Sequence, residues 1–248
     1  MKLINKHKSP NYDNRNKSKI KFLIIHYTAL RNCKEAISYL CNPNNKVSCH
    51  FLISQEGDIF CLVDESKRAW HAGISFWNNY TDINSHSIGI ELDYSGSNQN
   101  NIFSKKMINS LIKLLNYLKQ KYKIKDINIL AHSDIAPLRK KDPGKYFPWK
   151  ILSSNKISFI VNKNNTRDLN NLTKWFAKNS ISSREDICIF ILGYVGYQIN
   201  QIKDKKTLKK IIRSYQSHFL QNNVTGNIDQ LTLDYMMSHL INLVLTKK

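Results

Sequence analysis

The stretch AHSDIAPLRKKDPG (residues 131–144) places a histidine, a lysine and an aspartate on one loop that contains two prolines. It follows the apolar run INIL, and an earlier apolar run, FLII, ends in the same way, at His26. Two strands that each end in a histidine (His26 and His132), with Asp142 ten residues after the second, predict a zinc site. Three protein ligands with an open fourth position are typical of catalytic rather than structural zinc.

Alternating polarity and turn residues predict an α/β architecture around this loop. Residues 87–92 alternate, with Ile88, Ile90 and Leu92 on one face and Ser87, Gly89 and Glu91 on the other. The turn QEGD is typical of a hairpin. We expect strands at residues 21–26, 47–53, 59–63, 87–92 and 127–131 and helices at residues 34–40 and 104–122. Strands that alternate with helices predict a mixed central β-sheet flanked by helices, with functional groups at the strand ends.

The chain changes character after residue 161, where the polar segment NKNN begins. Beyond it, apolar residues recur at helical spacing, as in Leu208, Ile211, Ile212 and Tyr215. We therefore predict a first domain at residues 1–161, a linker at residues 162–167 and a small all-α bundle at residues 168–248.

The composition narrows the class of protein. The 248 residues carry a formal net charge of +20, which indicates either an anionic partner or a general bias of the composition towards lysine. The lysines are scattered rather than gathered in one stripe with aromatic residues, so we do not expect nucleic acid as a partner. No run approaches the roughly 20 apolar residues of a membrane span. The five cysteines include no C-x-x-C pair, and the basic N-terminal region lacks the apolar segment of an ordinary signal peptide.

Four motifs together resemble one family. They are IHYT (25–28), AWHAG (69–73), SIGIEL (87–92) and the loop from His132 to Gly144. In this order they are similar to the zinc-dependent N-acetylmuramoyl-L-alanine amidases of the AmpD and AmiD type. The resemblance implies the peptidoglycan-recognition/amidase fold. It also implies hydrolysis of the amide between the lactyl group of muramic acid and L-Ala, in peptidoglycan or in muropeptides.

The same resemblance implies one Zn²⁺ per chain, held by His26, His132 and Asp142. Neutral imidazole and carboxylate oxygen suit this ion. Asp134, two residues after His132, is a rival ligand or an outer partner of an imidazole. Asp142 is preferred because it matches the position of the ligand in the family. Some relatives have cysteine there, so the aspartate resembles the AmpD and AmiD branch.

Two further residues take catalytic roles by resemblance. Glu91 would move the proton between water and the leaving amine, and Lys140 would stabilise the developing oxyanion. Asp93 shares the strand face of Glu91 and is its rival, whereas Lys141 is expected to be a surface residue. A lone inward glutamate is costly unless it is paired or functional.

Five residues are candidates for the substrate groove: Tyr27, His50, Trp70, His71 and Arg139. Trp70 would stack on a sugar face, His71 would donate to a carbonyl or carboxylate, and Arg139 would hold a carboxylate of the stem peptide. His50, within the strand expected at residues 47–53, fits either the core or the groove.

The segment VTGNID (224–229), with Tyr215-Gln216 before it and Thr232 after it, resembles a small helical peptidoglycan-binding module. The alternative is a bundle that has only a structural role. A non-catalytic peptidoglycan-recognition protein is the alternative for the whole chain, but such proteins typically lose a zinc ligand. The odd cysteine count favours the cytoplasm, whereas the resemblance to AmiD-like enzymes favours the periplasm, which we predict.

Overall fold

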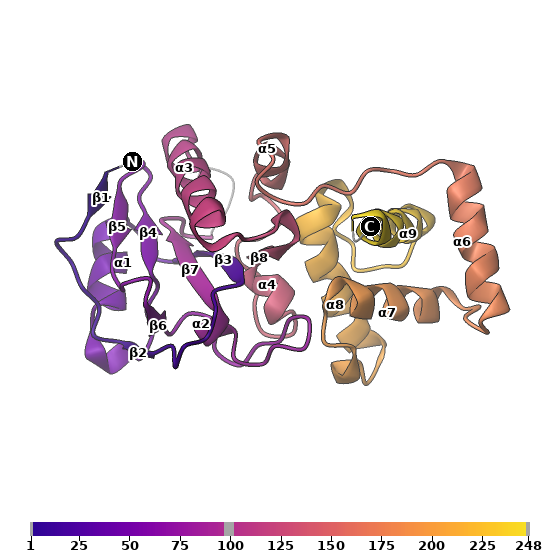
Figure 1. Cartoon of the computed structure of the whole chain (residues 1–248), viewed down its shortest axis with the longest axis horizontal. Coiled ribbons are helices and arrows are strands. Elements are labelled where there is room, and N and C mark those ends of the chain that lie inside the picture. Colours follow the sequence, from indigo (N-terminus) through magenta and orange to yellow (C-terminus); the bar gives the residue numbers. More distant parts are fainter. Residues whose placement is uncertain (1, 97–101, 247–248) are drawn as a thin grey trace. The chain divides into compact units, whose positions relative to one another are not determined.

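The computed structural model describes residues 2–96 and 102–246, and these fall into two compact units (Figure 1). Unit 1 comprises Met1–Ser75 and Thr81–Phe159. Unit 2 comprises Ile160–Lys248 together with the short segment Phe76–Tyr80. The domain limits expected from the sequence stay a prediction about which parts fold independently.

Unit 1 is built on a six-stranded sheet in the order β1-β5-β4-β7-β3-β8, with a separate pair of β2 and β6. The strands are β1 (Leu3–Ile4), β2 (Tyr12–Asn14), β3 (Phe22–Tyr27), β4 (Phe51–Ile53), β5 (Ile59–Cys61), β6 (Lys67–Ala69), β7 (Ser87–Leu92) and β8 (Ile129–Ala131). Strands β4, β7, β3 and β8 run parallel to one another, whereas β5 runs antiparallel to β4. The expected mixed sheet is therefore confirmed.

The helices of unit 1 include one long helix and several short ones. They are α1 (Cys33–Leu40), α2 (Ile83–His86), α3 (Lys105–Tyr122), α4 (His132–Ile135) and α5 (Trp149–Ser154), with 3₁₀ turns at Pro43–Asn45 and Asp126–Asn128. Ser104 caps α3 as expected, because its side chain accepts a hydrogen bond from the backbone of Met107.

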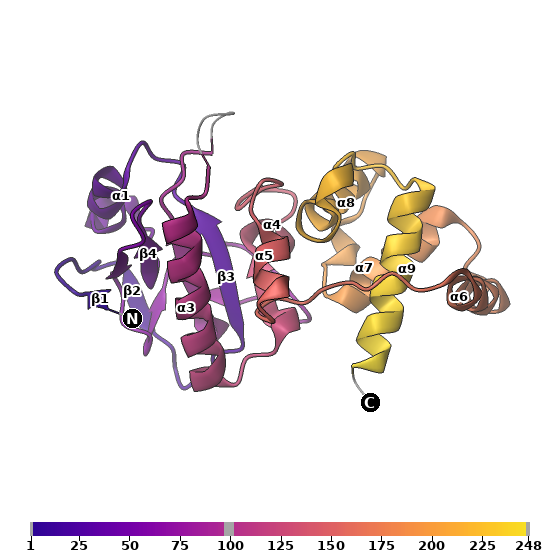
Figure 2. The ribbon, with the colours of Figure 1, turned by 90° about the horizontal axis from the view of Figure 1, so that it is seen from above.

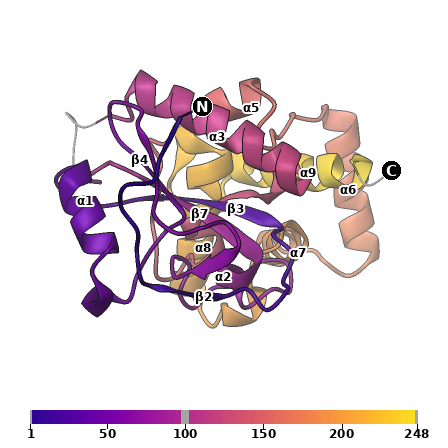
Figure 3. The same ribbon diagram turned by 60° about the vertical axis from the view of Figure 1, so that its left-hand side comes forward.

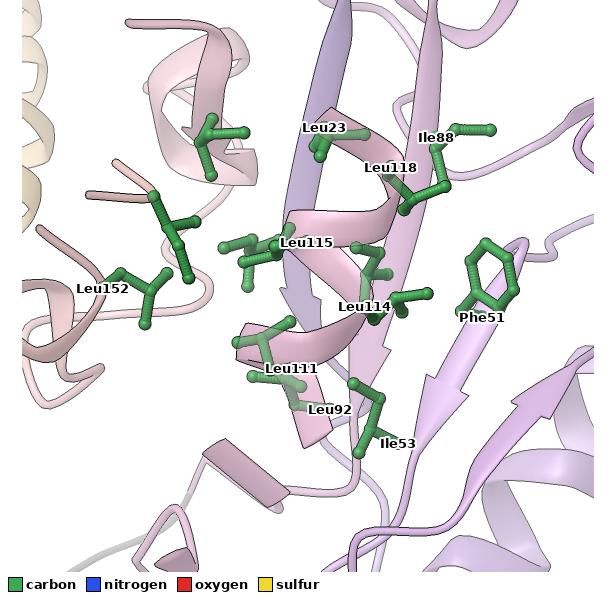
Figure 4. Close-up of a cluster of buried hydrophobic side chains, with 14 of the residues drawn as sticks. Leu23, Phe51, Ile53, Ile88, Leu92, Leu111, Leu114, Leu115, Leu118 and Leu152 are labelled. Carbon is green, nitrogen blue, oxygen red and sulfur yellow. The ribbon is translucent and has the colours of Figure 1, made fainter. Parts of the chain in front are cut away.

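Helix α3 covers one face of the sheet (Figures 2 and 3). Its leucines at 111, 114, 115 and 118 are fully buried against residues of β3, β4 and β7, such as Leu23, Phe51 and Ile88 (Figure 4). Because side chains alternate along a strand, the residues between these apolar ones point to the opposite face of the sheet. That opposite face carries the polar residues of β3 and β7.

Unit 2 is helical, and α9 packs against both α7 and α6. Its helices are α6 (Thr166–Lys178), α7 (Arg184–Val195), α8 (Lys205–Phe219) and α9 (Gln230–Leu245), with 3₁₀ turns at Ile199–Gln201 and Gln221–Asn223. No helix among the described residues is both long enough and apolar enough to cross a membrane.

The turn that resembles a peptidoglycan-binding module is held by Gln216, which is fully buried. Its Oε1 accepts hydrogen bonds from the backbone of Thr225 (3.0 Å) and Gly226 (2.6 Å), and its Nε2 donates to Thr232 Oγ1 (2.9 Å). These hydrogen bonds explain the motif by a structural role, because they hold the turn in place. Binding of polymer by this unit stays a prediction.

The segment Phe76–Tyr80 was not expected in unit 2. The Trp77 ring is 3% exposed and lies edge-on to Tyr197, with ring centroids 4.9 Å apart. Gly196 has a φ of +132°, and a Cβ there would lie 2.8 Å from the Trp77 ring. A glycine is therefore required beside this tryptophan.

Candidate active site

The ends of three parallel strands bring the candidate catalytic residues together. His26 on β3 pairs in register with Glu91 on β7, and Ile25 pairs with Ala131 on β8, directly before His132. Ile25 and Ala131 belong to the core beneath α3, so His26 and Glu91 point to the other face. The expectation that functional groups gather at strand ends matches this register.

The loop after β8 folds back and places Asp142 beside His132. The backbone of Ser133 donates to the carbonyl of Asp142 at 2.9 Å. Between them, the carbonyl of Ala136 accepts from the backbone N–H of Lys140 at 2.9 Å and closes a turn after α4. The rival ligand Asp134 is fully buried, and its Oδ2 accepts from the backbone of Ala131 at 2.8 Å.

His26, His132 and Asp142 form a compact set of possible metal ligands. The Nδ1 atoms of the two histidines lie 2.9 Å apart, and Asp142 Oδ2 lies 2.9 Å from His132 Nδ1 and 3.3 Å from His26 Nδ1. Ligand atoms about 2.0–2.1 Å from a tetrahedral zinc ion are about 3.4 Å apart. The three atoms are therefore spaced much as such an ion requires, and all three residues are buried.

The electrostatics of this set suit a cation. Burial lowers the pKa of His26 to about 4 and also lowers that of the neighbouring His71 well below its usual value, so both rings are neutral near pH 7. Burial alone would raise the pKa of Asp142, but the adjacent His132 and His26 outweigh it and hold that pKa below its usual value. Neutral imidazole and ionised carboxylate are the forms that bind metal ions.

Glu91 lies in an unusual environment for a carboxyl group. Its Oε2 atom is buried and has no hydrogen-bond partner among the described residues. Burial and the charge of Asp142 raise the pKa of Glu91 well above its usual value, and Lys140 opposes this rise. A buried, unpartnered carboxyl in this position is expensive, and such groups concentrate at functional sites. Asp93, its rival, instead accepts a hydrogen bond from the backbone of Gln55 at 3.4 Å.

The loop residues near Asp142 differ in exposure as the sequence suggested. Lys140 is partly buried, whereas Lys141 is exposed. Arg139 is exposed and donates through Nη2 to the carbonyls of Ala72 (2.7 Å) and Ile74 (2.8 Å). Its guanidinium thus fastens this neighbouring segment, and a contact with a substrate carboxylate stays a prediction.

Two aromatic candidates lie near the surface. Tyr27 ends β3 and is half-buried, with its ring edge-on to Tyr94 at 5.5 Å between centroids. Trp70 is half-buried, and its Nε1 donates to Asp13 Oδ2 at 2.7 Å. Both leave part of the ring exposed, so stacking on a sugar stays a prediction for Trp70.

The two histidine candidates for the groove lie instead in the interior. His50 is fully buried, its Nδ1 accepts from the backbone of Gly89 at 3.0 Å, and its Nε2 lies 3.0 Å from the carbonyl of Lys67. His71 is 6% exposed, and its two ring nitrogens lie near His26 and Ser87. These placements favour the core alternative for His50 and a structural rather than substrate-binding position for His71.

Three residues around His71 were missed as parts of the site. Asn84 accepts from the backbone of His71 (3.0 Å) and Ala72 (2.8 Å), Ser87 contacts the His71 ring, and Gly89 lies against it. For Ser87 and Gly89 a signal existed, because both share the strand face of Glu91. Nothing in the sequence marked Asn84.

Comparisons with known proteins agree with this arrangement. The family model for N-acetylmuramoyl-L-alanine amidases matches residues 16–145. The chain is 32% identical over 229 residues to N-acetylmuramoyl-L-alanine amidase AmiD of Escherichia coli (strain K12), covering 86% of this chain and 80% of that protein. It is 37% identical over 166 residues to 1,6-anhydro-N-acetylmuramyl-L-alanine amidase AmpD of Haemophilus influenzae, covering 59% of this chain and 89% of the relative.

Solved structures extend the likeness to the whole fold. A structure of E. coli AmiD with its substrate anhydro-N-acetylmuramic acid-L-Ala-D-gamma-Glu-L-Lys superposes with a TM-score of 0.75 at 28% identity. The superposition covers 94% of this chain and 91% of AmiD. With a family model over half of its length and a relative aligned over most of both chains, this protein belongs to the N-acetylmuramoyl-L-alanine amidase family of enzymes.

Proposed function

We propose that this protein hydrolyses the amide between the lactyl group of N-acetylmuramic acid, or its anhydro form, and L-Ala. The observation that carries the proposal is the buried, unpartnered Oε2 of Glu91 at the same strand ends as the His26–His132–Asp142 set. The substrates of AmiD and AmpD, as their names and the AmiD complex state them, support the anhydro-muropeptide as the substrate class.

The proposed cofactor is one Zn²⁺ per chain, held by His26, His132 and Asp142. Two neutral imidazoles and one carboxylate are a donor set that this ion uses in catalytic sites. When bound, zinc would activate water and polarise the scissile carbonyl. The spacing of the three ligand atoms, between 2.9 and 3.3 Å, supports this assignment.

Glu91 and Lys140 would divide the remaining work. Glu91 accepts a proton as water adds to the lactyl carbonyl carbon and delivers it to the alanine nitrogen as the C–N bond breaks. The products are the lactyl carboxylate and the free amine of the peptide. The Lys140 ammonium lies close enough to influence the carboxyl of Glu91 and would stabilise the negative oxygen that develops on the same carbonyl.

A non-catalytic peptidoglycan-recognition protein is the alternative, and it is not favoured. The chain is a member of an enzyme family and retains all three residues of the candidate metal set together with Glu91 and Lys140. A protein that only bound muropeptides would have no use for a costly buried carboxyl with an unsatisfied oxygen.

Product analysis tests the function directly. Purified protein with zinc should convert anhydro-muramyl tripeptide into two fragments, one gaining a new lactyl carboxylate and the other a free L-Ala amine, by mass spectrometry. Purified sacculi form the second substrate and show whether intact wall is cut as well. If both substrates remain uncleaved although the protein carries about one zinc ion per chain, the enzyme assignment fails and the recognition alternative stands.

We place the protein in the periplasm and infer that unit 2 helps to hold the polymer. The support is that E. coli AmiD aligns with 86% of the chain, whereas Haemophilus influenzae AmpD aligns with 59%. Fractionation of native cells should recover the protein with envelope markers. Recovery with cytoplasmic markers alone would contradict this location and leave a structural role for the helices.

A further inference from the structure

A chain of hydrogen bonds behind the site sets the direction in which His26 presents its lone pair. A carbonyl oxygen only accepts, so the Ser87 hydroxyl, 2.6 Å from the carbonyl of Ile83, donates to it. Ser87 Oγ must then accept from His71 Nε2 at 3.2 Å, which leaves a lone pair on His71 Nδ1. That nitrogen accepts from His26 Nε2 at 3.1 Å, so the Nδ1 lone pair of His26 faces Asp142.

The second histidine of the set is oriented by the residue next to His71. His132 Nε2 lies 3.3 Å from the carbonyl of Ala72, which can only accept, so the hydrogen is on Nε2 and the lone pair is on Nδ1. Asn84 fixes this segment, because its Oδ1 accepts from the backbone of both His71 and Ala72. One short segment thus orients both imidazoles.

The room for the His71 ring comes from Gly89. A Cβ at position 89 would lie 2.3 Å from Cγ of His71, a separation that real Cβ atoms do not show. Gly89 is buried and lies between Ser87 and Glu91 on the face of β7 that carries the candidate site. The face of this strand therefore carries three functions in order: the hydroxyl of Ser87, the space at Gly89 and the carboxyl of Glu91.

We propose that His71 and Ser87 are positioning residues that fix the tautomer of His26, and thereby the affinity for zinc, rather than contacts for the substrate. The inference rests on the proposed zinc function. Hydrogen-bond partners of metal-binding histidines typically contribute about 10- to 100-fold to metal affinity. His71 and Ser87 are buried and contact a ligand or its neighbour, as such partners do.

The first test compares two buried serines by zinc competition against a chromophoric chelator. Ser87→Ala should weaken zinc binding about 10-fold or more, because His71 loses the acceptor that fixes its tautomer. Ser9→Ala is the matched control, since the Ser9 hydroxyl is also buried and donates to a carbonyl, that of Leu40, at 2.5 Å, while it accepts from the backbone of Asn11 rather than from the segment of His71. Equal losses in the two variants would indicate general loosening and overturn the proposal.

The second test changes His71 itself. His71→Leu should lower zinc affinity about 10- to 100-fold, and His71→Gln should recover much of it, because its amide oxygen can accept from His26. Imidazole ¹H–¹⁵N spectra of the metal-free protein should place the proton of His26 on Nε2 in the parent and show mixed tautomers in Ser87→Ala. Thermal unfolding of the metal-free proteins shows whether each variant is folded.

The outcomes separate this inference from the function on which it rests. A parent that binds zinc tightly, with His71→Leu and Ser87→Ala binding it equally well, overturns the positioning role and leaves the enzyme assignment intact. A parent that binds no zinc contradicts the metal assignment, and the positioning role falls with it. Weakened zinc binding restored by His71→Gln, with the expected tautomer, supports both.

Discussion

Glu91→Gln is expected to lower turnover of anhydro-muropeptides by about 10²- to 10⁴-fold, the usual contribution of a residue that transfers a proton. Glutamine keeps the shape of the side chain and removes the proton-accepting oxygen, so the variant tests chemistry rather than packing. The fold should survive, because Oε2 of Glu91 has no hydrogen-bond partner to lose among the described residues.

The measurement pairs turnover with zinc content. Glu91 is not one of the three candidate ligands, so Glu91→Gln should retain about one zinc per chain while turnover falls. Glu56→Gln provides the control, because Glu56 is an exposed carboxylate paired with Lys106. Turnover close to that of the parent in Glu91→Gln would remove this residue from the proposed mechanism, whatever the zinc content.

Neighbouring lysines offer a second matched pair for the same assay. Lys140→Ala should reduce turnover about 10²-fold or more, the scale of one lost oxyanion-stabilising group. The adjacent Lys141 is exposed, so Lys141→Ala should leave turnover nearly unchanged. Equal losses of turnover in the two variants would indicate that the overall charge of the loop, rather than one positioned ammonium group, stabilises the oxyanion.

Strong periodicity explains which parts of the fold could be predicted. The strand at residues 87–92 coincides with β7 (Ser87–Leu92), because three buried aliphatic residues alternate with small or polar ones. The capped helix after Ser104 was also expected correctly. Strand β8 begins later than expected, at Ile129, since residues 126–128 form a 3₁₀ turn.

Short polar elements escaped prediction because their stability comes from distant partners. Strand β6 (Lys67–Ala69) carries two basic residues and has no apolar alternation, yet it pairs with β2 (Tyr12–Asn14). A two- or three-residue strand leaves too little pattern to read from one sequence. Tertiary pairing, rather than local preference, decides such segments.

The candidate site likewise divides into residues that the sequence could indicate and contacts that it could not. Family resemblance pointed to His26, His132 and Asp142, and their side chains lie within contact of one another. It did not show that His71 faces His26 rather than a groove, because that depends on the direction of hydrogen bonds from Ser87 and on the space at Gly89. Such relations exist only after separate segments have come together in the fold.

His132→Ala is expected to remove both metal and activity. Three protein ligands hold a catalytic zinc ion, and the loss of one imidazole leaves a site with two ligands and an unoccupied cavity. Purified His132→Ala should carry less than about a tenth of the zinc of the parent by elemental analysis, and cleavage of anhydro-muropeptides should fall to background. Undiminished zinc in this variant would reject the ligand assignment.

A comparison of two aspartates then decides between the rival ligands. Asp142→Asn removes the negative charge that faces both imidazoles at 2.9 and 3.3 Å, so zinc should be lost or bound far more weakly. Asp134→Asn should retain zinc, because the Asp134 carboxylate bonds the backbone of Ala131 and an asparagine oxygen can accept the same hydrogen bond. The opposite pattern would make Asp134 the third ligand. Both aspartates lie on one loop, but the hydrogen bond from the Ser133 backbone to the Asp142 carbonyl holds Asp142 beside His132. Asp142 is therefore the aspartate that is positioned to share a metal ion with His132.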